Sequence, residues 1–356
     1  MNKQILTTPL GDSYPIITGS GILDSVGNML VEIVKPCRVM VLTDSNVAPL
    51  YLDRAVRSLE QSGFTVSTKV VPAGEESKSM KTLAEVLEAF CEAHMTRTDI
   101  AVALGGGVIG DLTGFASGCY LRGIRFVQVP TTLLSAVDAS VGGKTAVNLE
   151  HGKNLAGLFH QPSAVICDTE TMKTLTPHEL ADGAAEAIKS GILGDEDLFA
   201  IFETGDPASQ LQEIVTRSVA YKAKIVTEDP NEHGVRKLLN LGHTPAHAIE
   251  LLSNFEISHG HAVAMGMGIM TRAAAKRGIL SQEDAACILD TLRRNDLPVV
   301  SPYSAADMAR IAALDKKAAA NDITVILPEK IGQCRMEKIP LTELEAMFAD
   351  GMGAEP

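Results

Sequence analysis

The sequence predicts an α/β domain with a parallel sheet, followed by a mainly α-helical domain. Its first half alternates short runs rich in β-branched residues with segments of helical spacing, a pattern typical of strands joined by crossover helices. Beyond Pro177 the strand signal nearly disappears, and apolar residues recur at helical spacing. The length of 356 residues suits two domains of about 100–200 residues each.

Five β-rich runs predict the parallel strands of the first domain. Helical spacing up to Leu59, and again from about Ser77 to His94, separates the first three of them. The opening segments, residues 1–9 and 12–19, predict a hairpin beside the sheet. The five runs are RVMVLTD (38–44), TVSTKVV (65–71), IAVALGGG (100–107), RFVQVPTT (125–132) and AVICDT (164–169).

Four segments with helical spacing dominate the second half. Only residues 322–332, DITVILPEKIG, predict a late pair of strands there. The change in pattern places a boundary near residues 174–177, so we expect domains at 1–175 and 176–356. The helical segments are HELADGAAEAIKSGIL (178–193), ASQLQEIVTRSVAYKAKIV (208–226), HAVAMGMGIMTRAAAKRG (261–278) and SQEDAACILDTLRRN (281–295).

The composition limits the classes of partner. A net charge of −13 and the absence of Trp argue against nucleic-acid binding and against an anionic membrane surface. The six cysteines are scattered without C-x-x-C spacing, which favours free thiols in a reducing cytoplasm. There is no apolar signal-peptide region and no uninterrupted apolar run of about 18 residues. We therefore expect a globular cytoplasmic protein.

Two loops are candidates for holding a phosphate group. Gly105, Gly107 and Gly110 fit G-x-G-x-x-G between a strand and a helix, where glycine lets the backbone approach a pyrophosphate. The acidic residue usual about 20 positions later is missing, so an ordinary tight turn is an equally good interpretation. In PAGEESKS (72–79), Glu75 and Lys78 either bind a ribose and a phosphate or belong to a plain helix N-terminus.

A third segment and several cations indicate an anionic ligand. The stretch QVPTTLLSAVDASVGGKTAV (128–147) is unusually rich in small polar residues around one lysine. Five cations stand in apolar or glycine-rich surroundings, unlike lysines on a solvated helix face. In a chain this acidic they suggest a substrate that carries phosphate or carboxylate. They are Arg122, Lys144, Lys153, Lys189 and Arg236.

Four of the nine histidines lie between Asn240 and Ala262. His243 and His247 are four residues apart, which places two imidazoles on one helix face, although Pro245 lies between them. Either Thr244 caps a helix with Pro245 in its first turn, or a longer helix is kinked at Pro245. A catalytic zinc site needs three protein ligands, and Glu186 is the best candidate for a carboxylate ligand; the alternative is an exposed helix glutamate.

Taken together and in this order, the segments resemble the 3-dehydroquinate synthases, sugar phosphate cyclases of the shikimate pathway. The resemblance runs from about Ala73 to Gly268, and residues 314–332 form a further similar segment near the C-terminus. It implies a dehydroquinate synthase-like fold with an NAD-binding α/β domain (1–175), a helical metal- and substrate-binding domain (176–356), bound Zn²⁺ or Co²⁺, and a homodimer. The residues that carry it are GGGVIGDLTGF, YLRGIRFVQVPTTLLSAVDASVGGKTAVN, GKNLAGLF, ELADGAAEAIKSGIL, VRKLLNLGHTPAHAIE and HGHAVAMGM.

The resemblance also implies roles for individual residues. Metal ligands would be Glu186, His243 and His259, and His247 would transfer protons. Asp138, Lys144, Asn154, Lys189 and Arg236 would hold the substrate at the reacting atoms, with further contacts from Lys153, Lys222, Asn240 and Lys316 or Lys317. Arg122 would reach the phosphate in the neighbouring subunit's site. NAD contacts would come from Asp44, Gly74, Glu75, Lys78, Gly107, Val108, Ile109, Gly110, Asp111, Thr131, Thr132, Lys144, Lys153, Thr171, Met172, Lys173 and Thr174.

The chain departs from the family pattern at a few positions. The stretch G-H-T-x-G-H-A has Pro245–Ala246 in place of an apolar residue and glycine, and His261 replaces the glutamate of H-G-E-A-V. Ala139 stands for a serine, and His178 stands where arginine is common. None of these changes removes a ligand or substrate lysine that the resemblance implies. They concern the surroundings of the metal and of His247 rather than the reaction.

The implied reaction starts from 3-deoxy-D-arabino-heptulosonate 7-phosphate, an anionic sugar acid that suits the local cations. A transient oxidation by NAD, elimination of phosphate, re-reduction and an intramolecular aldol closure give 3-dehydroquinate, and the cofactor ends unchanged. Two alternatives share some of the motifs. One is a zinc-dependent polyol or glycerol-phosphate dehydrogenase, and the other is a non-catalytic sensor of NAD or a sugar phosphate.

Overall fold

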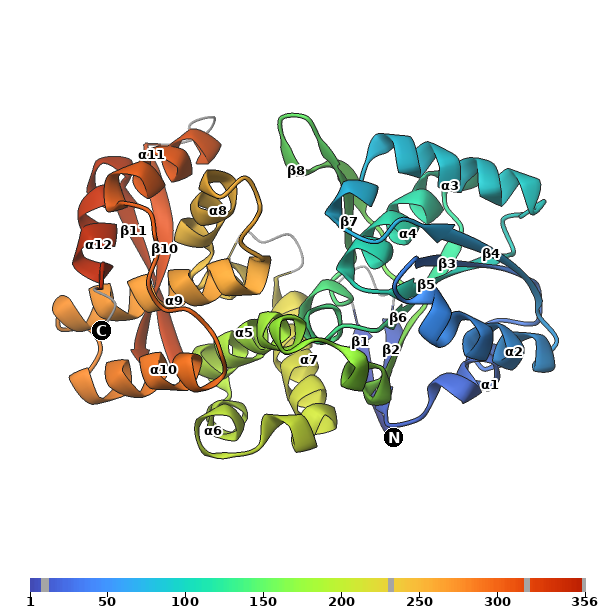
Figure 1. Cartoon of the computed structure of the whole chain (residues 1–356), viewed down its shortest axis with the longest axis horizontal. Helices are drawn as coiled ribbons and strands as arrows, with labels where there is room; N and C mark the ends of the chain where they lie inside the picture. Colours follow the sequence, from blue (N-terminus) through green and yellow to red (C-terminus); the bar gives the residue numbers. More distant parts are fainter. Residues whose placement is uncertain (8–12, 230–233, 317–320, 354–356) are drawn as a thin grey trace. The chain divides into compact units, whose positions relative to one another are not determined.

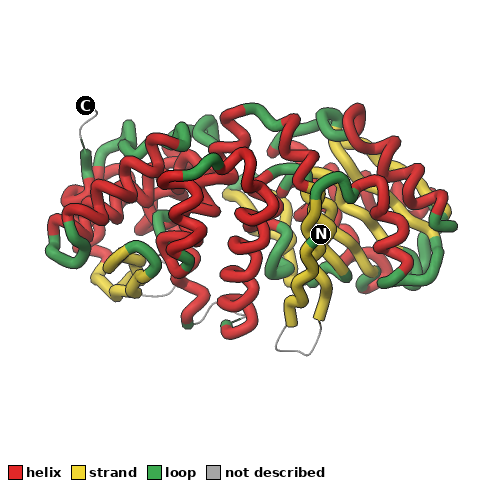
Figure 2. The backbone as a smooth tube through the Cα atoms, turned by 90° about the horizontal axis from the view of Figure 1, so that it is seen from below, coloured by secondary structure: helices red, strands yellow, loops and turns green. Residues whose placement is uncertain are grey.

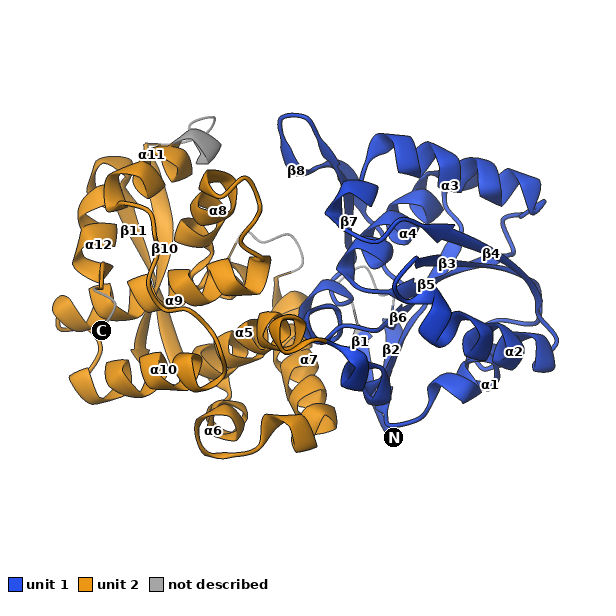
Figure 3. Cartoon of the chain, viewed as in Figure 1, with its two compact units in different colours: residues 1–175 blue, residues 176–356 orange. Residues whose placement is uncertain are grey.

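The computed structural model describes residues 1–7, 13–229, 234–316 and 321–353, without the side chains of residues 7 and 314–316. The chain divides into two compact units, Met1–Leu175 and Thr176–Pro356 (Figure 3). The first is an α/β unit and the second is mainly helical, which confirms the predicted fold class (Figures 1 and 2). None of the described helices is long and apolar enough to cross a membrane.

A seven-stranded sheet forms the centre of unit 1, in the order β1-β2-β9-β6-β5-β3-β4. Only the β1–β2 pairing is antiparallel, so the predicted N-terminal hairpin extends an otherwise parallel sheet. The five predicted runs all form strands, with ends within two residues of those expected. The strands are β1 (Asn2–Thr7), β2 (Ser13–Gly19), β3 (Arg38–Asp44), β4 (Thr65–Val71), β5 (Ile100–Gly105), β6 (Arg125–Pro130) and β9 (Ala164–Asp168).

Helices cover both faces of this sheet because alternate residues of its buried strands are apolar on both sides. In β3, Val39 and Val41 face one hydrophobic core, while Met40 and Leu42 face the other. Helices α1 (Val26–Val31) and α2 (Asp53–Gln61) pack on the first face. Helices α3 (Met80–Glu92) and α4 (Gly107–Cys119) cover the second, as Figure 1 shows.

The strand order reverses between the neighbouring strands β3 and β5. The chain leaves β3 toward β4 at one edge, and it leaves β5 toward β6 on the other side. In parallel α/β sheets, ligands bind beyond the carboxyl ends of the strands at such a switch point. Here Asp44 ends β3, and the Gly105–Gly107 turn follows β5. Two of the predicted nucleotide-binding positions therefore meet where the topology favours a ligand.

A small hairpin in unit 1 was not predicted. Strands β7 (Lys144–Leu149) and β8 (Gly152–Phe159) pair with each other and form a sheet of their own. Gly157 permits the close pairing, because a Cβ atom there would lie 2.2 Å from the Thr145 carbonyl oxygen.

Eight α-helices, a few short helical turns and one hairpin form the described part of unit 2. Helix α9 runs through its centre and packs against α5, α8, α10 and α12 (Figure 1). Its glycines permit these approaches, since a Cβ at Gly266 would lie 2.0 Å from the Gly242 carbonyl oxygen. The elements are α5 (Pro177–Gly194), α6 (Glu196–Thr204), α7 (Leu211–Glu228), α8 (His243–Leu252), α9 (His259–Lys276), α10 (Gln282–Arg294), α11 (Ala305–Lys316), β10 (Asp322–Lys330), β11 (Gln333–Pro340) and α12 (Leu344–Gly351).

The pH dependence of stability provides a test of the packing in unit 1. His160 stacks on Phe126, with ring centroids 5.2 Å apart, and its Nε2–H donates to the Ile124 carbonyl oxygen at 2.9 Å. Burial lowers the pKa of His160 in the folded protein. As pH falls below about 6.5, the unfolded chain therefore takes up the proton first, and stability falls. Thermal denaturation at pH 7.5 and 5.5 should show a smaller loss for His160→Gln, which keeps a donor but does not titrate; equal losses would contradict the prediction.

Candidate functional site

The three predicted metal ligands converge in unit 2. Glu186 comes from the middle of α5, and His243 and His259 are the first residues of α8 and α9. One potential ligand atom from each lies within 4.8 Å of the others. Nε2 of His243 and Nε2 of His259 are 3.7 and 3.6 Å from Glu186 Oε1. These separations suit atoms that each lie about 2.1 Å from one shared ion.

The environment of the Glu186 carboxylate favours the binding of a cation. Its side chain is 2% exposed, and neither oxygen makes a hydrogen bond of normal geometry with the described residues. Burial by itself would raise the pKa of Glu186, but the ion pair with Lys189 and the two histidines hold that pKa well below its ordinary value. A buried, charged carboxylate with unused lone pairs is what a metal ion requires.

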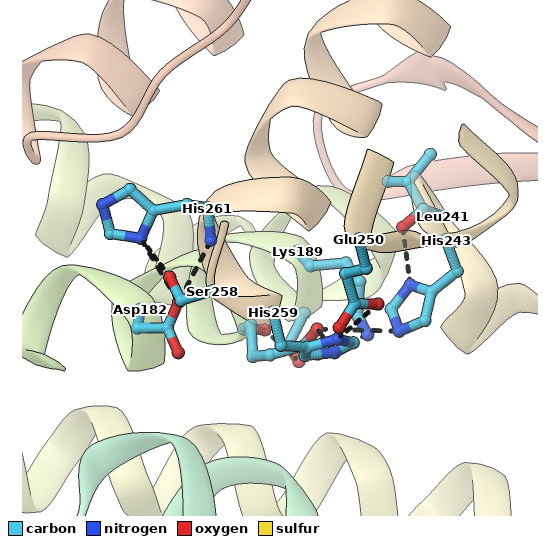
Figure 4. A network of polar contacts seen from close by, with 10 residues as sticks. Asp182, Lys189, Leu241, His243, Glu250, Ser258, His259 and His261 are labelled. Atoms are coloured by element: carbon cyan, nitrogen blue, oxygen red, sulfur yellow. Dashed lines mark hydrogen bonds and ion pairs between the residues drawn. The ribbon is translucent and has the colours of Figure 1, made fainter. Parts of the chain in front are cut away.

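The two ligand histidines are held by different partners. Nδ1 of His243 lies 3.2 Å from the Leu241 carbonyl oxygen, which directs its Nε2 toward Glu186 (Figure 4). Burial and the neighbouring Lys189 hold the pKa of His243 well below its ordinary value. His259 Nδ1 faces the buried carboxylate of Glu250 at 3.5 Å. Burial would lower the pKa of His259, but its contacts with Glu186 and Glu250 raise it to about 10.

This donor set fits the implied divalent metal. Two imidazole nitrogens and one carboxylate are a known ligand combination of catalytic zinc, and they leave further positions open. A metal ion held by Glu186, His243 and His259 would supply positive charge beside the two carboxylates, and imidazoles bind a metal in their neutral form.

The start of α8 separates His243 from His247. The helix begins at His243 after Gly242, which adopts a left-handed φ of 77° as N-cap. Pro245 therefore lies in the first turn of the helix, and the helix is not a longer one kinked at Pro245. The cap is Gly242, however, and not Thr244 as the first alternative proposed. His247 lies one turn further, exposed, with its ring 5.6 Å from that of His243 and nearly perpendicular to it. His247 is not in the ligand cluster.

Unit 2 also holds three of the predicted substrate-binding cations. Lys189, Lys222 and Arg236 are buried, with 3%, 9% and 3% of their surface exposed. Arg236 lies in the short helix Val235–Asn240, which ends at the predicted Asn240. Buried cations need compensating anions, and Glu186 provides one for Lys189. The prediction for Lys316 or Lys317 concerns side chains outside the described part of the chain.

The remaining predicted substrate residues lie in unit 1. Lys144, Lys153 and Asn154 all belong to the β7–β8 hairpin. Asn154 has a left-handed φ of 59°, and its backbone N–H donates to Asn148 Oδ1 at 2.9 Å. Asp138 lies in the helical turn Ser135–Ala139. Arg122 is exposed at the end of the short helix Tyr120–Arg122, also with positive φ.

The glycine-rich turn leaves the N-terminus of α4 open. Gly106 is its N-cap and makes no side-chain cap, and Gly106, Gly107 and Val108 are partly exposed. Gly110 has another purpose, because a Cβ there would lie 2.5 Å from Gln128 Oε1 of strand β6. It therefore permits close packing of helix on sheet, the role of the third glycine in nucleotide-binding turns.

Lys78 and Asp111 form an ion pair beside this turn. Asn148 Nδ2, in β7, donates to Glu75 Oε1 at 2.7 Å. The loop of residues 72–79 is therefore bound to β7 at the same place. Burial raises the pKa of Asp111, although the charge of Lys78 opposes this. Glu75 and Lys78 of the 72–79 loop and Asp111 of α4, all predicted for NAD binding, are thus brought close together.

Burial differs among the predicted cofactor residues. Ile109 and Met172 are 1% and 0% exposed and their side chains pack in the interior, so any contact with a cofactor there would come from the backbone. In the same segment, Thr171 Oγ1 donates to the Asp168 carbonyl oxygen, and Thr174 contacts the Tyr51 hydroxyl at 2.6 Å. Lys173 is exposed and pairs with Glu170. Of the other predicted positions, Asp44 is half-buried at the end of β3, and Gly74 is exposed in a loop. Thr131 is buried, and Thr132 Oγ1 accepts from the Ser135 N–H.

Sequence reasoning missed two carboxylates beside the metal ligands. Glu250 faces His259 from α8, and Asp182 contacts the first turn of α9 from α5. Helical spacing offered a signal for both. Asp182 stands one turn before Glu186, and Glu250 lies on α8 seven residues after His243, so each shares a helix face with a predicted ligand.

Comparisons with known proteins agree along most of the chain. The family model described as 3-dehydroquinate synthase N-terminal matches residues 68–182, and the C-terminal model of the same family matches residues 183–318. The 3-dehydroquinate synthase of Agrobacterium fabrum is 41% identical over 350 residues, which cover 93% of this chain and 92% of that protein. The enzyme of the same name from Caldanaerobacter subterraneus is 43% identical over 329 residues, covering 90% and 92%.

A solved structure is similar in the same way. The 2-epi-5-epi-valiolone synthase from Streptomyces hygroscopicus, with NAD⁺ and Zn²⁺ bound, is 29% identical and superposes with a TM-score of 0.86 over 96% of this chain and 97% of that one. Family models, curated relatives and fold thus lead to one conclusion. The chain belongs to the 3-dehydroquinate synthase family.

Proposed function

We propose that the chain is a 3-dehydroquinate synthase that uses NAD and a divalent metal, Zn²⁺ or Co²⁺. It converts 3-deoxy-D-arabino-heptulosonate 7-phosphate to 3-dehydroquinate and phosphate, a step of the shikimate pathway and of aromatic amino-acid biosynthesis. As a reaction class this is phosphate elimination by a carbon–oxygen lyase. Membership of the family supports the reaction, and the cluster of Glu186, His243 and His259 is the structural observation that supports the metal.

We assign metal and substrate binding to unit 2 and NAD binding to unit 1. The bound groups supply reversible hydride transfer and a Lewis acid, and the chain supplies orientation and charge. In unit 2, the buried cations Lys189, Lys222 and Arg236 suit a substrate that carries phosphate and carboxylate. His247 is exposed one turn from a ligand, where it can carry a proton without binding the metal.

Three features of unit 1 support the assignment of NAD. The glycine turn follows the strand next to the switch point, the N-terminus of α4 is open, and Asp44 ends the neighbouring strand. A helix N-terminus with unpaired N–H groups attracts a pyrophosphate. We extend the assignment to Glu75, Lys78 and Asp111 because they cluster beside that turn.

We further propose a cytoplasmic homodimer with no nucleic-acid or membrane partner. The acidic net charge of −13 supports the absence of nucleic-acid binding. The resemblance to the family supports the dimer, in which Arg122 would contact the phosphate bound by the neighbouring subunit. Its exposed position at the end of a short helix is compatible with that role.

Product analysis tests the reaction directly. With the sugar-acid phosphate, NAD and zinc, the protein should release one phosphate per substrate with no net formation of NADH, because the hydride is returned within each turnover. Phosphate can be measured colorimetrically, and NADH by its absorbance. Protein treated with a chelator is the control, and it should release no phosphate. NADH accumulating in proportion to substrate would favour the dehydrogenase alternative, and tight NAD binding with no turnover would favour a sensor.

A further inference from the structure

Asp182 connects the two helices that carry Glu186 and His259. Its Oδ1 accepts hydrogen bonds from Ser258 Oγ at 2.6 Å and from the backbone N–H of His261 at 3.1 Å. The same oxygen lies 3.2 Å from Nδ1 of His261 (Figure 4). Asp182 belongs to α5, while the residues it contacts form the start of α9. One carboxylate oxygen thus receives three contacts from the neighbouring helix.

These contacts replace the usual cap of α9. Ser258 is the N-cap residue, but its side chain makes no capping hydrogen bond within its own helix. In most helices an N-cap side chain accepts from the N–H of the second or third helical residue. Here His261 is the third residue, and its N–H bonds to Asp182 instead. The cap is therefore provided by another helix.

Backbone contact reinforces the connection at the same point. A Cβ atom at Gly260 would lie 2.0 Å from the Asp182 carbonyl oxygen, so only glycine permits this approach. Gly260 stands directly between His259 and His261 in the first turn of α9. Asp182 is one helical turn before Glu186 on the same face of α5. The contact therefore joins the two helices within one turn of both ligands.

We propose that Asp182 and His261 are positioning residues for the metal site, which hold His259 at its distance from Glu186 before a metal ion arrives. The inference rests on the proposed metal site and gives His261 a task that the resemblance does not supply. A ligand displaced by a fraction of an ångström loses affinity, and loss of an outer contact usually costs about 10–100-fold in metal binding. Asp182 acts through the start of α9, not by contact with the ion.

His178 explains how the ring of His261 keeps its orientation. The two imidazoles stack with centroids 4.1 Å apart and an angle of 9° between their planes. His178 lies in the first turn of α5, which begins with a capping box between Thr176 and Glu179. The stack holds the His261 ring in a plane in which Nδ1 faces Asp182 and Ser258. Both departures from the family pattern at positions 178 and 261 therefore belong to one contact.

Metal affinity of Asp182→Ala tests the proposal. We expect competition with a chelator to show zinc bound about 10–100-fold more weakly than by the unmodified protein. The visible d–d spectrum of the cobalt-loaded variant should also change, because the ligand geometry is altered. Asp182→Asn keeps an accepting oxygen and should retain most of the affinity.

Asp195→Ala is the matched control. Asp195 also caps a helix of unit 2, accepting from the Leu198 N–H at 3.0 Å, and also takes a side-chain partner, Arg217. Its loss should lower the melting temperature without changing zinc affinity or the cobalt spectrum. If Asp182→Ala behaves like Asp195→Ala, with lower stability and unchanged metal binding, Asp182 is an ordinary cap and the proposal is wrong.

Two variants of His261 test its part. His261→Asn places an amide N–H near the position of Nδ1 and should bind zinc nearly as well as the unmodified protein. His261→Leu removes the donor and should weaken zinc binding in the same direction as Asp182→Ala. Equal affinity of the two variants would remove His261 from the proposal. If the unmodified protein binds no zinc, the proposed metal site itself fails, an outcome distinct from every result above.

Discussion

His243→Ala is expected to abolish tight zinc binding and to reduce kcat/KM by about a thousandfold, or about 4 kcal/mol of transition-state stabilisation. His243 supplies one of three ligands, and its Nε2 lies 3.7 Å from the partner ligand Glu186. Two remaining ligands hold zinc weakly because a catalytic site needs three from the protein. Metal content after dialysis, measured together with phosphate release, checks both parts of this expectation.

His247→Ala provides the contrast. His247 lies one helical turn after His243 on the same helix, but it is outside the ligand cluster, so this variant removes an imidazole that is not a ligand. This variant should keep its zinc and still lose activity, and the loss should be greatest at the pH where proton transfer limits the rate. Retention of zinc by His243→Ala, or its loss from His247→Ala, would reverse the roles assigned to the two histidines.

The architecture of unit 1 was predictable because its strands are buried on both faces. Runs such as RVMVLTD and IAVALG are continuous in apolar residues, are too short for helices, and are separated by helical spacing, so both their type and their order could be predicted. The β7–β8 hairpin gave no such signal. All residues of β8 are partly or fully exposed. Its pairing depends on Gly157, whose role becomes visible only when Ala146 lies opposite and the Thr145 carbonyl oxygen comes close.

Residue spacing alone predicted part of the metal site, and the complete ligand set came only from the resemblance to the family. Residue spacing suggested the pair His243 and His247, whereas the structure brings His243 together with His259. These two side chains are sixteen positions apart in the sequence. Helix α8 and the turn after it bring their ring nitrogens within 4.8 Å of each other. The resemblance resolved this, since it transferred a ligand set position by position. Helical spacing places Glu250 on the same face of α8 as His243, but its contact with His259 depends on how α8 packs against α9.

Lys189→Met is expected to destabilise the metal-free protein by about 3–5 kcal/mol, since it leaves the buried carboxylate of Glu186 without its ion-pair partner. Methionine preserves most of the volume, so loss of charge rather than a cavity dominates. A divalent ion restores the missing positive charge. Zinc should therefore raise the melting temperature of Lys189→Met by more than that of the unmodified protein.

Glu186→Gln and the double variant Glu186→Gln/Lys189→Met test whether the loss of charge causes the destabilisation of Lys189→Met. Glu186→Gln leaves Lys189 buried without its counter-ion, so it should also be destabilised, but zinc should not rescue it because a ligand is lost. Combining both substitutions removes both charges, and the double variant should be more stable without metal than the sum of the single losses predicts. Strict additivity would mean that Lys189 and Glu186 do not compensate each other. A coupling of the expected sign would show that Lys189 holds the carboxylate charged in the metal-free protein, so that the ligand set is ready before the metal binds.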